Sequence, residues 1–164
     1  MKKNTFQDYF TEFLSDDLQI LERYGFTDRE RAYIVDLMAT ACRILDVQNA
    51  VLVHGDFDIS HIFHANGRYS GLLDLGEIRG NNRLYDLATF VIFYGLPDII
   101  AYSYLLEGYR EITRLTDNDL YAIELMALFQ ILLYLGKRVD QPSMRDPLFR
   151  FAKKQLDRIN GTYG

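Results

Sequence analysis

Six side chains that can bind a metal ion or move a proton are concentrated between residues 54 and 74. They are His54, Asp56, Asp58, His61, His64 and Asp74. A loop would present His54, Asp56 and His61, and a hairpin would return Asp74 to the same end. Imidazole and carboxylate ligands from the two segments could then surround a divalent cation. A metal-dependent hydrolase is one reading of these residues, although their spacing matches no known zinc motif.

The segment around these residues has the pattern of short strands. Residues 50–53 form an apolar run that predicts a buried strand. Residues 62–65 and 69–75 flank Asn66-Gly67. Because both residues tolerate positive φ, Asn-Gly between such runs predicts a hairpin with a type I′ turn. We therefore expect one small hairpin within an otherwise helical chain.

The remainder of the chain has helical periodicity. Thr27 followed by Glu30 predicts a capping box, and Thr116 followed by acidic residues predicts a second N-cap. Near-continuous apolar character predicts a buried central helix over 120–134. The other helices are expected over an N-terminal stripe starting at Phe6, a further short helix to Gly25, and the ranges 28 to about 46–49, 85–94, 97–115 and 148–159.

Composition places the chain among ordinary globular proteins and predicts one domain over 1–164. Its 164 residues are 49% hydrophobic and 25% charged, with a formal net charge of -5. An acidic chain is a poor general binder of nucleic acid, and no uninterrupted apolar run is long enough to span a membrane. The start lacks a secretory signal, and the single Cys42 cannot form an internal disulfide. We therefore expect a cytoplasmic protein, with Cys42 buried as a small apolar residue.

Three motifs in order resemble the aminoglycoside phosphotransferase family. Residues 54–61 (HGDFDISH) resemble the H-G-D-x-x-x-x-N catalytic loop, residues 73–77 (LDLGE) the metal motif, and residues 80–88 (GNNRLYDLA) the G-D-P-x-Y-D-L-A segment. The resemblance implies an α+β, mostly α-helical fold like the C-terminal lobe of a protein kinase, with an embedded small β-hairpin. It implies a kinase-like transferase that phosphorylates a hydroxyl of a small molecule with ATP or GTP.

The resemblance also implies a role for each matching residue. Asp56 corresponds to the catalytic base, and Asp74 with His61 to the ligands of Mg²⁺. His61 stands where the family usually has Asn, although macrolide phosphotransferases also have His there. His54 and Asp86 correspond to residues that order the catalytic loop. No residue is assigned to nucleotide binding.

The family's β-rich N-terminal lobe has no counterpart in the pattern, since a glycine-rich loop and a strand lysine are both missing. We therefore expect a truncated enzyme, or one completed in trans by a separate N-lobe or a homo-oligomer. A catalytically inactive lobe that serves as a binding or regulatory module is the alternative. The face near residues 51–56 is expected to promote self-association.

Overall fold

The computed structural model describes residues 6–45, 50–92, 99–138 and 140–163. The chain divides into two compact units. We call residues 1–46 with 116–164 the helical unit, and residues 47–115 the strand-bearing unit. The described part of the chain is mostly helical with small antiparallel sheets, which confirms the α+β prediction at that level.

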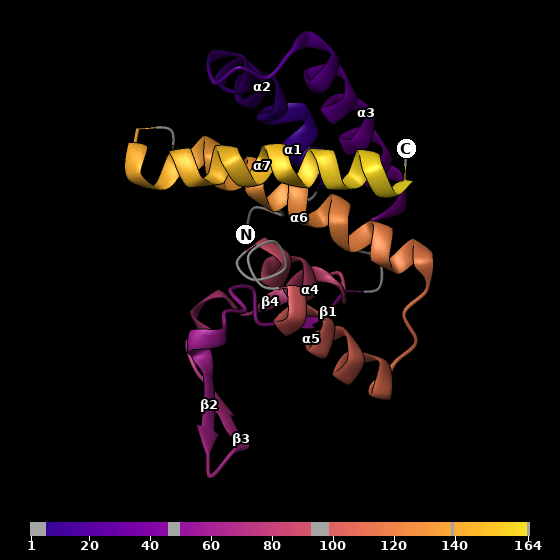
Figure 1. The fold of residues 1–164 in the computed structure, drawn as a ribbon, viewed down its shortest axis with the longest axis vertical. Helices are drawn as coiled ribbons and strands as arrows, with labels where there is room; N and C mark the ends of the chain where they lie inside the picture. Colours follow the sequence, from indigo (N-terminus) through magenta and orange to yellow (C-terminus); the bar gives the residue numbers. More distant parts are fainter. Residues whose placement is uncertain (1–5, 46–49, 93–98, 139, 164) are drawn as a thin grey trace. The chain divides into compact units, whose positions relative to one another are not determined.

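The described residues of the helical unit form five helices (Figure 1). They are α1 (Phe6–Glu12), α2 (Leu14–Arg23), α3 (Asp28–Ile44), α6 (Asp117–Arg138) and α7 (Pro142–Tyr163). α6 and α7 pack along each other, and α6 also contacts α2 and α3. The N-terminal segment is two short helices that meet at Phe13, as the periodicity suggested.

Two capping boxes begin helices of this unit: the predicted one at Thr27, and one at Thr116, where only an N-cap was predicted. Thr27 Oγ1 accepts from the backbone N–H of Glu30 at 3.2 Å, and Glu30 Oε2 accepts from the backbone N–H of Thr27 at 2.8 Å. Thr116 and Asp119 repeat this reciprocal pair at the start of α6. Each box satisfies two backbone donors that the first helical turn leaves without intrahelical partners.

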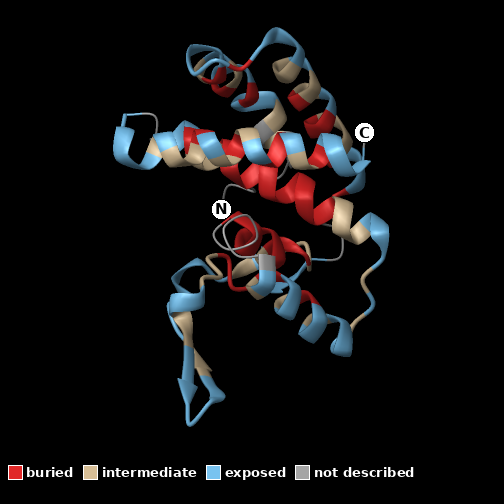
Figure 2. Ribbon diagram, in the orientation of Figure 1, coloured by how far each residue is buried: buried red, intermediate tan, exposed pale blue. Residues whose placement is uncertain are grey.

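The predicted buried helix is α6. Its residues 122–132 are all buried, as Figure 2 shows. By length and composition alone α6 could cross a membrane, but 67% of its most apolar window is buried within the protein. Burial of this extent is also what the core helix of a globular protein shows.

Cys42 in α3 is half-buried, and burial raises the pKa of its thiol, which disfavours the reactive thiolate.

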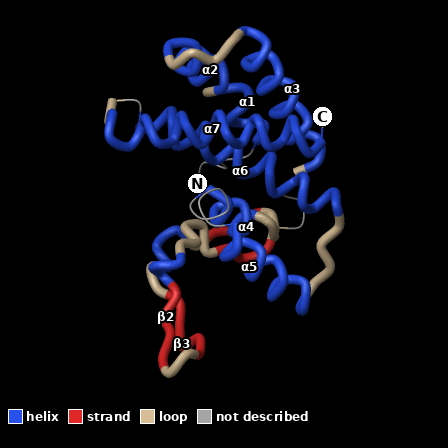
Figure 3. Tube along the Cα trace, viewed as in Figure 1, coloured by secondary structure: helices blue, strands red, loops and turns tan. Residues whose placement is uncertain are grey.

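Where the strand-bearing unit is described, it contains two separate two-stranded antiparallel sheets (Figure 3). Its elements are β1 (Val51–Val53), η1 (Ile59–His61), β2 (Ile62–Ala65), β3 (Arg68–Leu72), η2 (Leu75–Glu77), β4 (Arg79–Asn81), α4 (Tyr85–Phe90) and α5 (Ile99–Ile112). β2 and β3 form the predicted hairpin, whose turn residues have φ of 53° at Asn66 and 72° at Gly67. β1 pairs instead with β4, with Val53 opposite Arg79.

Several predicted details of the elements were wrong. β4 was not predicted, so the expectation of a single hairpin is corrected to two sheets. β1 is a strand, but only Val53 is buried, because a two-stranded ribbon covers few of its own residues. α3 ends at Ile44, before the predicted 46–49, and α5 ends at Ile112. α7 begins at Pro142, six residues early. The predicted ends near 94–98 lie outside the described residues.

Candidate active site

The loop after β1 is held by a carboxylate distant in the sequence. Asp86 lies in the first turn of α4, and its two oxygens accept different backbone N–H groups. His54 N donates to Oδ2 at 2.8 Å, and Gly55 N donates to Oδ1 at 3.0 Å. Hydrogen bonds to an ionised acceptor are about twice as strong as neutral ones. The Asp86 side chain therefore fixes the peptide groups that lead into Asp56.

His54 is buried, and both of its ring nitrogens are engaged. Nε2 lies 2.8 Å from the carbonyl oxygen of Leu73, so it must carry the proton and donate. Nδ1 then accepts from the backbone N–H of Asp56 at 3.4 Å. The imidazole thus links the peptide of Asp56 to the residue that precedes Asp74. It connects the two segments and has no lone pair left for a metal ion.

Asp56, His61 and Asp74 are brought together by this arrangement. One ligand atom from each lies within 4.8 Å of the others. His61 Nδ1 lies 3.0 Å from the carbonyl oxygen of Asp56, so Nδ1 donates to it. In the neutral ring, the lone pair is therefore on Nε2, which lies 3.7 Å from Asp74 Oδ2. A backbone carbonyl that fixes the imidazole tautomer in this way is a common feature of metal-binding histidines.

The conformation of Asp74 directs its carboxylate. Leu73 N donates to the carbonyl oxygen of His61 at 2.9 Å, which extends the contact between the two arms of the hairpin. The chain then turns at Asp74, whose φ of 56° and ψ of 57° are left-handed. For a residue other than glycine this conformation costs energy, and such positions cluster at functional sites. Two carboxylates and one imidazole could hold a small, hard divalent cation.

Gly55 is a position that only glycine can occupy. Its φ is 87°, and a Cβ placed there would lie 2.2 Å from the carbonyl oxygen of Glu77. The catalytic-loop backbone and the turn after Asp74 are therefore in direct backbone contact. Asp58 and His64 do not belong to the cluster of Asp56, His61 and Asp74. Asp58 caps η1 by accepting from Ser60 N at 2.7 Å, and His64 is exposed on β2.

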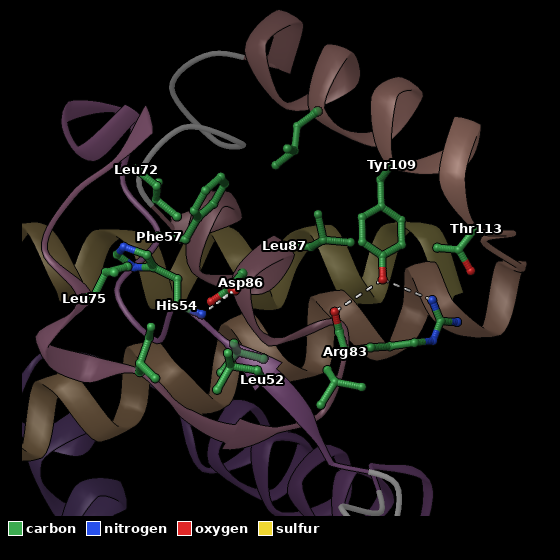
Figure 4. A pocket seen from close by; sticks show the side chains of 14 residues that line it. Leu52, His54, Phe57, Leu72, Leu75, Arg83, Asp86, Leu87, Tyr109 and Thr113 are labelled. Atoms are coloured by element: carbon green, nitrogen blue, oxygen red, sulfur yellow. Dashed lines mark hydrogen bonds between the residues drawn. The ribbon is translucent and has the colours of Figure 1, made fainter. Parts of the chain in front are cut away.

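An apolar cavity of about 610 Å³ adjoins the loop within the strand-bearing unit (Figure 4). His54, Phe57 and Asp86 contribute to its wall, but Asp56 and Asp74 do not. On the α5 side, Tyr109 donates to the carbonyl oxygen of Arg83 at 3.4 Å and accepts from its guanidinium at 3.4 Å. This cavity was not predicted, because it is lined by residues from four separate segments.

Sequence reasoning also missed Arg79. Its guanidinium contacts both the loop that carries Asp56 and the turn that carries Asp74, through Gly55 and Glu77. No motif pointed to it, since an arginine in a loop-like segment has many ordinary roles. The pairing of Arg79 with Val53 across β1 and β4 was the missing information.

Residues 3–119 match the profile of the phosphotransferase enzyme family. Because the match covers well over half of the chain, the chain belongs to this family. The match includes the whole strand-bearing unit and ends in the first turn of α6. No curated protein matches the chain.

Proposed function

We propose that the chain is a kinase-like C-terminal lobe that takes part in transfer of the γ-phosphoryl group of ATP or GTP to a hydroxyl of a small molecule. The convergence of Asp56, His61 and Asp74 on one point carries this proposal. Between the paired strands β1 and β4, the chain forms the loop with Asp56, then the β2–β3 hairpin, then the turn with Asp74. This order supports the kinase-like lobe. We also propose that residues 1–164, with both compact units, belong to one domain.

The proposed chemistry assigns separate tasks to the three residues. Asp56 accepts the proton of the acceptor hydroxyl as the hydroxyl oxygen attacks the γ-phosphorus. The bond between the γ-phosphorus and the oxygen that bridges it to the β-phosphate breaks, and ADP or GDP leaves. Asp74 and His61 would hold Mg²⁺, and the ion would supply positive charge that offsets the negative charge of the phosphates. His54 and Asp86 keep the loop in position. Phosphoryl transfer depends mainly on positioning and charge stabilisation, so a preorganised loop suits it.

Exposed apolar residues on β1 and on the β2–β3 hairpin support a partner that covers this part of the strand-bearing unit. Leu52 is 76% exposed, Tyr69 66% and Phe63 52%. Such residues, grouped on one hairpin and one short strand, are typical of surfaces that another protein covers. We propose a separate N-lobe or a second copy of the chain as the partner, in the cytoplasm, with no nucleic acid or membrane involved.

Calorimetric titration of ATP and GTP, with and without Mg²⁺, tests the metal site. We expect Mg²⁺-dependent binding that is lost in Asp74→Asn. Asp58→Asn is the matched control, because it removes a carboxylate from the same segment while Asn still caps η1. Asp56→Asn should keep nucleotide binding and lower any transfer by about 10²–10⁴-fold.

Other outcomes distinguish the remaining functions. Tight binding of Zn²⁺ or Mn²⁺ without nucleotide, with hydrolysis that depends on Asp56, would favour a metal-dependent hydrolase. Absence of binding at high nucleotide concentration would favour an inactive binding or regulatory module. Loss of binding in Asp58→Asn as well as in Asp74→Asn would contradict the proposed ligand set.

A further inference from the structure

We infer that Arg79 is a positioning residue that clamps the loop carrying Asp56 to the turn carrying Asp74. This inference rests on the proposed function only for the reason why the two segments must be held together. Arg79 lies in β4 opposite Val53 of β1. Val53 immediately precedes the loop that contains Asp56. This register brings its guanidinium to the place where the two segments meet.

The guanidinium contacts three separate parts of the strand-bearing unit. Nη1 donates to the carbonyl oxygen of Glu77 at 3.1 Å and to Glu77 Oε2 at 2.9 Å. Nη2 donates to the carbonyl oxygen of Gly55 at 3.3 Å and to the hydroxyl of Tyr85 at 2.7 Å. The guanidinium also lies 4.9 Å from the centre of the Tyr85 ring. The rigid fork of arginine suits this set of acceptors, which a lysine ammonium would match less well.

The two carbonyl contacts are the important ones for the site. The Gly55 carbonyl belongs to the peptide that joins Gly55 to Asp56, and Glu77 is the third residue after Asp74. The N–H of Gly55 is already held by Asp86 and the N–H of Asp56 by His54. With Arg79 on the Gly55 carbonyl, the peptides on both sides of Gly55 are fixed.

The close approach of the two backbones explains why a cation is needed there. A Cβ on Gly55 would lie 2.2 Å from Glu77 O, so the two segments are as close as a glycine permits. The carbonyl oxygens of Gly55 and Glu77 both face the guanidinium of Arg79. Two carbonyl dipoles that point to one place repel each other unless donors lie between them. Arg79 supplies these donors, and its removal would let the segments separate.

A simple surface ion pair between Arg79 and Glu77 is the alternative explanation. Their contact is partly exposed, with 66% of the Glu77 side chain accessible, and such pairs contribute little. The two explanations differ in what Glu77→Gln does. That substitution removes the ion pair but keeps the backbone carbonyl of Glu77. Under the clamp, Glu77→Gln is nearly silent and Arg79→Gln is not.

Hydrogen exchange on the full chain without metal, followed by mass spectrometry, tests the clamp directly. In Arg79→Gln we expect exchange to rise about tenfold, as for loss of one hydrogen bond to a charged group, in both residues 54–58 and 75–78. Arg79→Lys should give an intermediate rise in both segments. Glu77→Gln should match the wild type, and the helical unit should keep its protection in every variant.

Affinity for Mn²⁺, followed by the electron paramagnetic resonance signal of the free ion, gives the second readout. We expect about tenfold weaker binding in Arg79→Gln, partial recovery in Arg79→Lys, and less than about threefold change in Glu77→Gln. A general loss of folding would instead remove protection throughout the strand-bearing unit. In that case, Arg79→Lys decides, because it keeps the charge and loses the fork.

Three results would overturn the clamp: unchanged exchange in Arg79→Gln, loosening of one segment alone, or an Arg79→Lys variant that equals the wild type in both segments. A wild-type chain that binds no divalent cation would count against the proposed function. The exchange measurement would still decide the clamp, since it is made without metal.

Discussion

The two units of this protein differ in the interactions that stabilise each of them internally. In the helical unit, α6 is surrounded by apolar contacts, and residues such as Ile123 and Leu128 are completely buried. In the strand-bearing unit, the site depends on hydrogen bonds between distant segments, including those that Asp86 accepts and those that His54 and Arg79 donate. Apolar burial is non-directional and tolerates adjustment, whereas these bonds require particular atoms at particular distances.

The two units should therefore be sensitive to different kinds of substitution. A packed helix loses stability in proportion to the cavity or overlap that a substitution creates. A site made of linked loops loses its geometry when one contact is broken, even if the surrounding elements persist. Substitutions that change one atom group in each unit can therefore separate stability from site geometry.

Gly55→Ala should have the largest effect. It would combine a left-handed φ of 87° with a Cβ placed 2.2 Å from a backbone oxygen that cannot move aside cheaply. Backbone strain alone costs about 1–3 kcal/mol, and the overlap adds to it. We expect loss of protection from exchange over residues 54–58 and 75–78 and at least about tenfold weaker Mn²⁺ binding, if the chain binds this ion.

Gly67→Ala is the matched control for this substitution. Its φ is also positive, at 72°, but a Cβ there meets nothing within 4 Å. It should cost only the strain, about 1–2 kcal/mol, and leave residues 54–58 protected. Equal effects of the two substitutions on the loop would show that the contact between Gly55 and Glu77 is unimportant.

Local signals in the sequence predicted much of the helical unit and the hairpin. The capping box at Thr27 and the turn at Asn66-Gly67 need only nearby residues, and both are present. β4 was missed because Arg79–Asn81 is too short to have a pattern of its own and exists by pairing with β1. The start of α7 was predicted at residue 148, six residues too late, because a proline such as Pro147 commonly interrupts a helix. The helix begins at Pro142, a favourable residue for a first turn, and continues through Pro147.

The site could be predicted by residue type but not by its connections. The spacing indicated that His54, Asp56, His61 and Asp74 would meet. The ligand atoms of the last three do lie together, whereas both ring nitrogens of His54 are engaged by Leu73 and Asp56. Their roles stay predictions. The partners that fix them are largely backbone groups, such as the carbonyls of Leu73 and Asp56. Because every residue has these groups, no residue type in the sequence could indicate them.

Gly136→Ala tests how tightly the helical unit is packed around Gly136. Gly136 lies in α6, and a Cβ there would approach Oδ1 of the buried Asp17 to 2.6 Å. Alanine normally stabilises a helix interior by about 1 kcal/mol relative to glycine. Here we expect destabilisation of about 1–3 kcal/mol, because the packed surroundings must shift. Urea unfolding followed by circular dichroism measures the change.

Gly108→Ala in α5 provides the comparison for that experiment. A Cβ at Gly108 meets nothing within 4 Å, so the ordinary helical preference should appear as a gain of about 0.5–1 kcal/mol. Opposite signs for the two glycines would show that packing around Asp17, and not helix propensity, decides the result at Gly136. A gain at both positions would contradict the overlap.

The smallest effect concerns the pH dependence of the helical unit. Glu124 is buried in α6, where its carboxylate accepts from Gln155 at 2.7 Å and from Arg158 at 2.8 Å. Burial raises the pKa of Glu124 above its ordinary value of 4.5, although Arg158 and Gln155 oppose the rise. The folded state then holds this proton more tightly than the unfolded state. The contribution of Glu124 to stability therefore falls as pH rises from 4.5 through the folded pKa.

Glu124→Gln should remove that fall, so the variant should gain on the wild type as pH rises above 4.5. Glu30 provides a control of opposite sign in the same unit. Its hydrogen bond from Lys153, together with those from Thr27, lowers the pKa of Glu30 below 4.5. The contribution of Glu30 to stability is present above pH 4.5 and is lost as pH falls through the folded pKa. Glu30→Gln should therefore flatten the dependence of stability on pH only below pH 4.5. Urea midpoints measured on both sides of this pH separate the two carboxylates, and a single shared window would contradict the assignment.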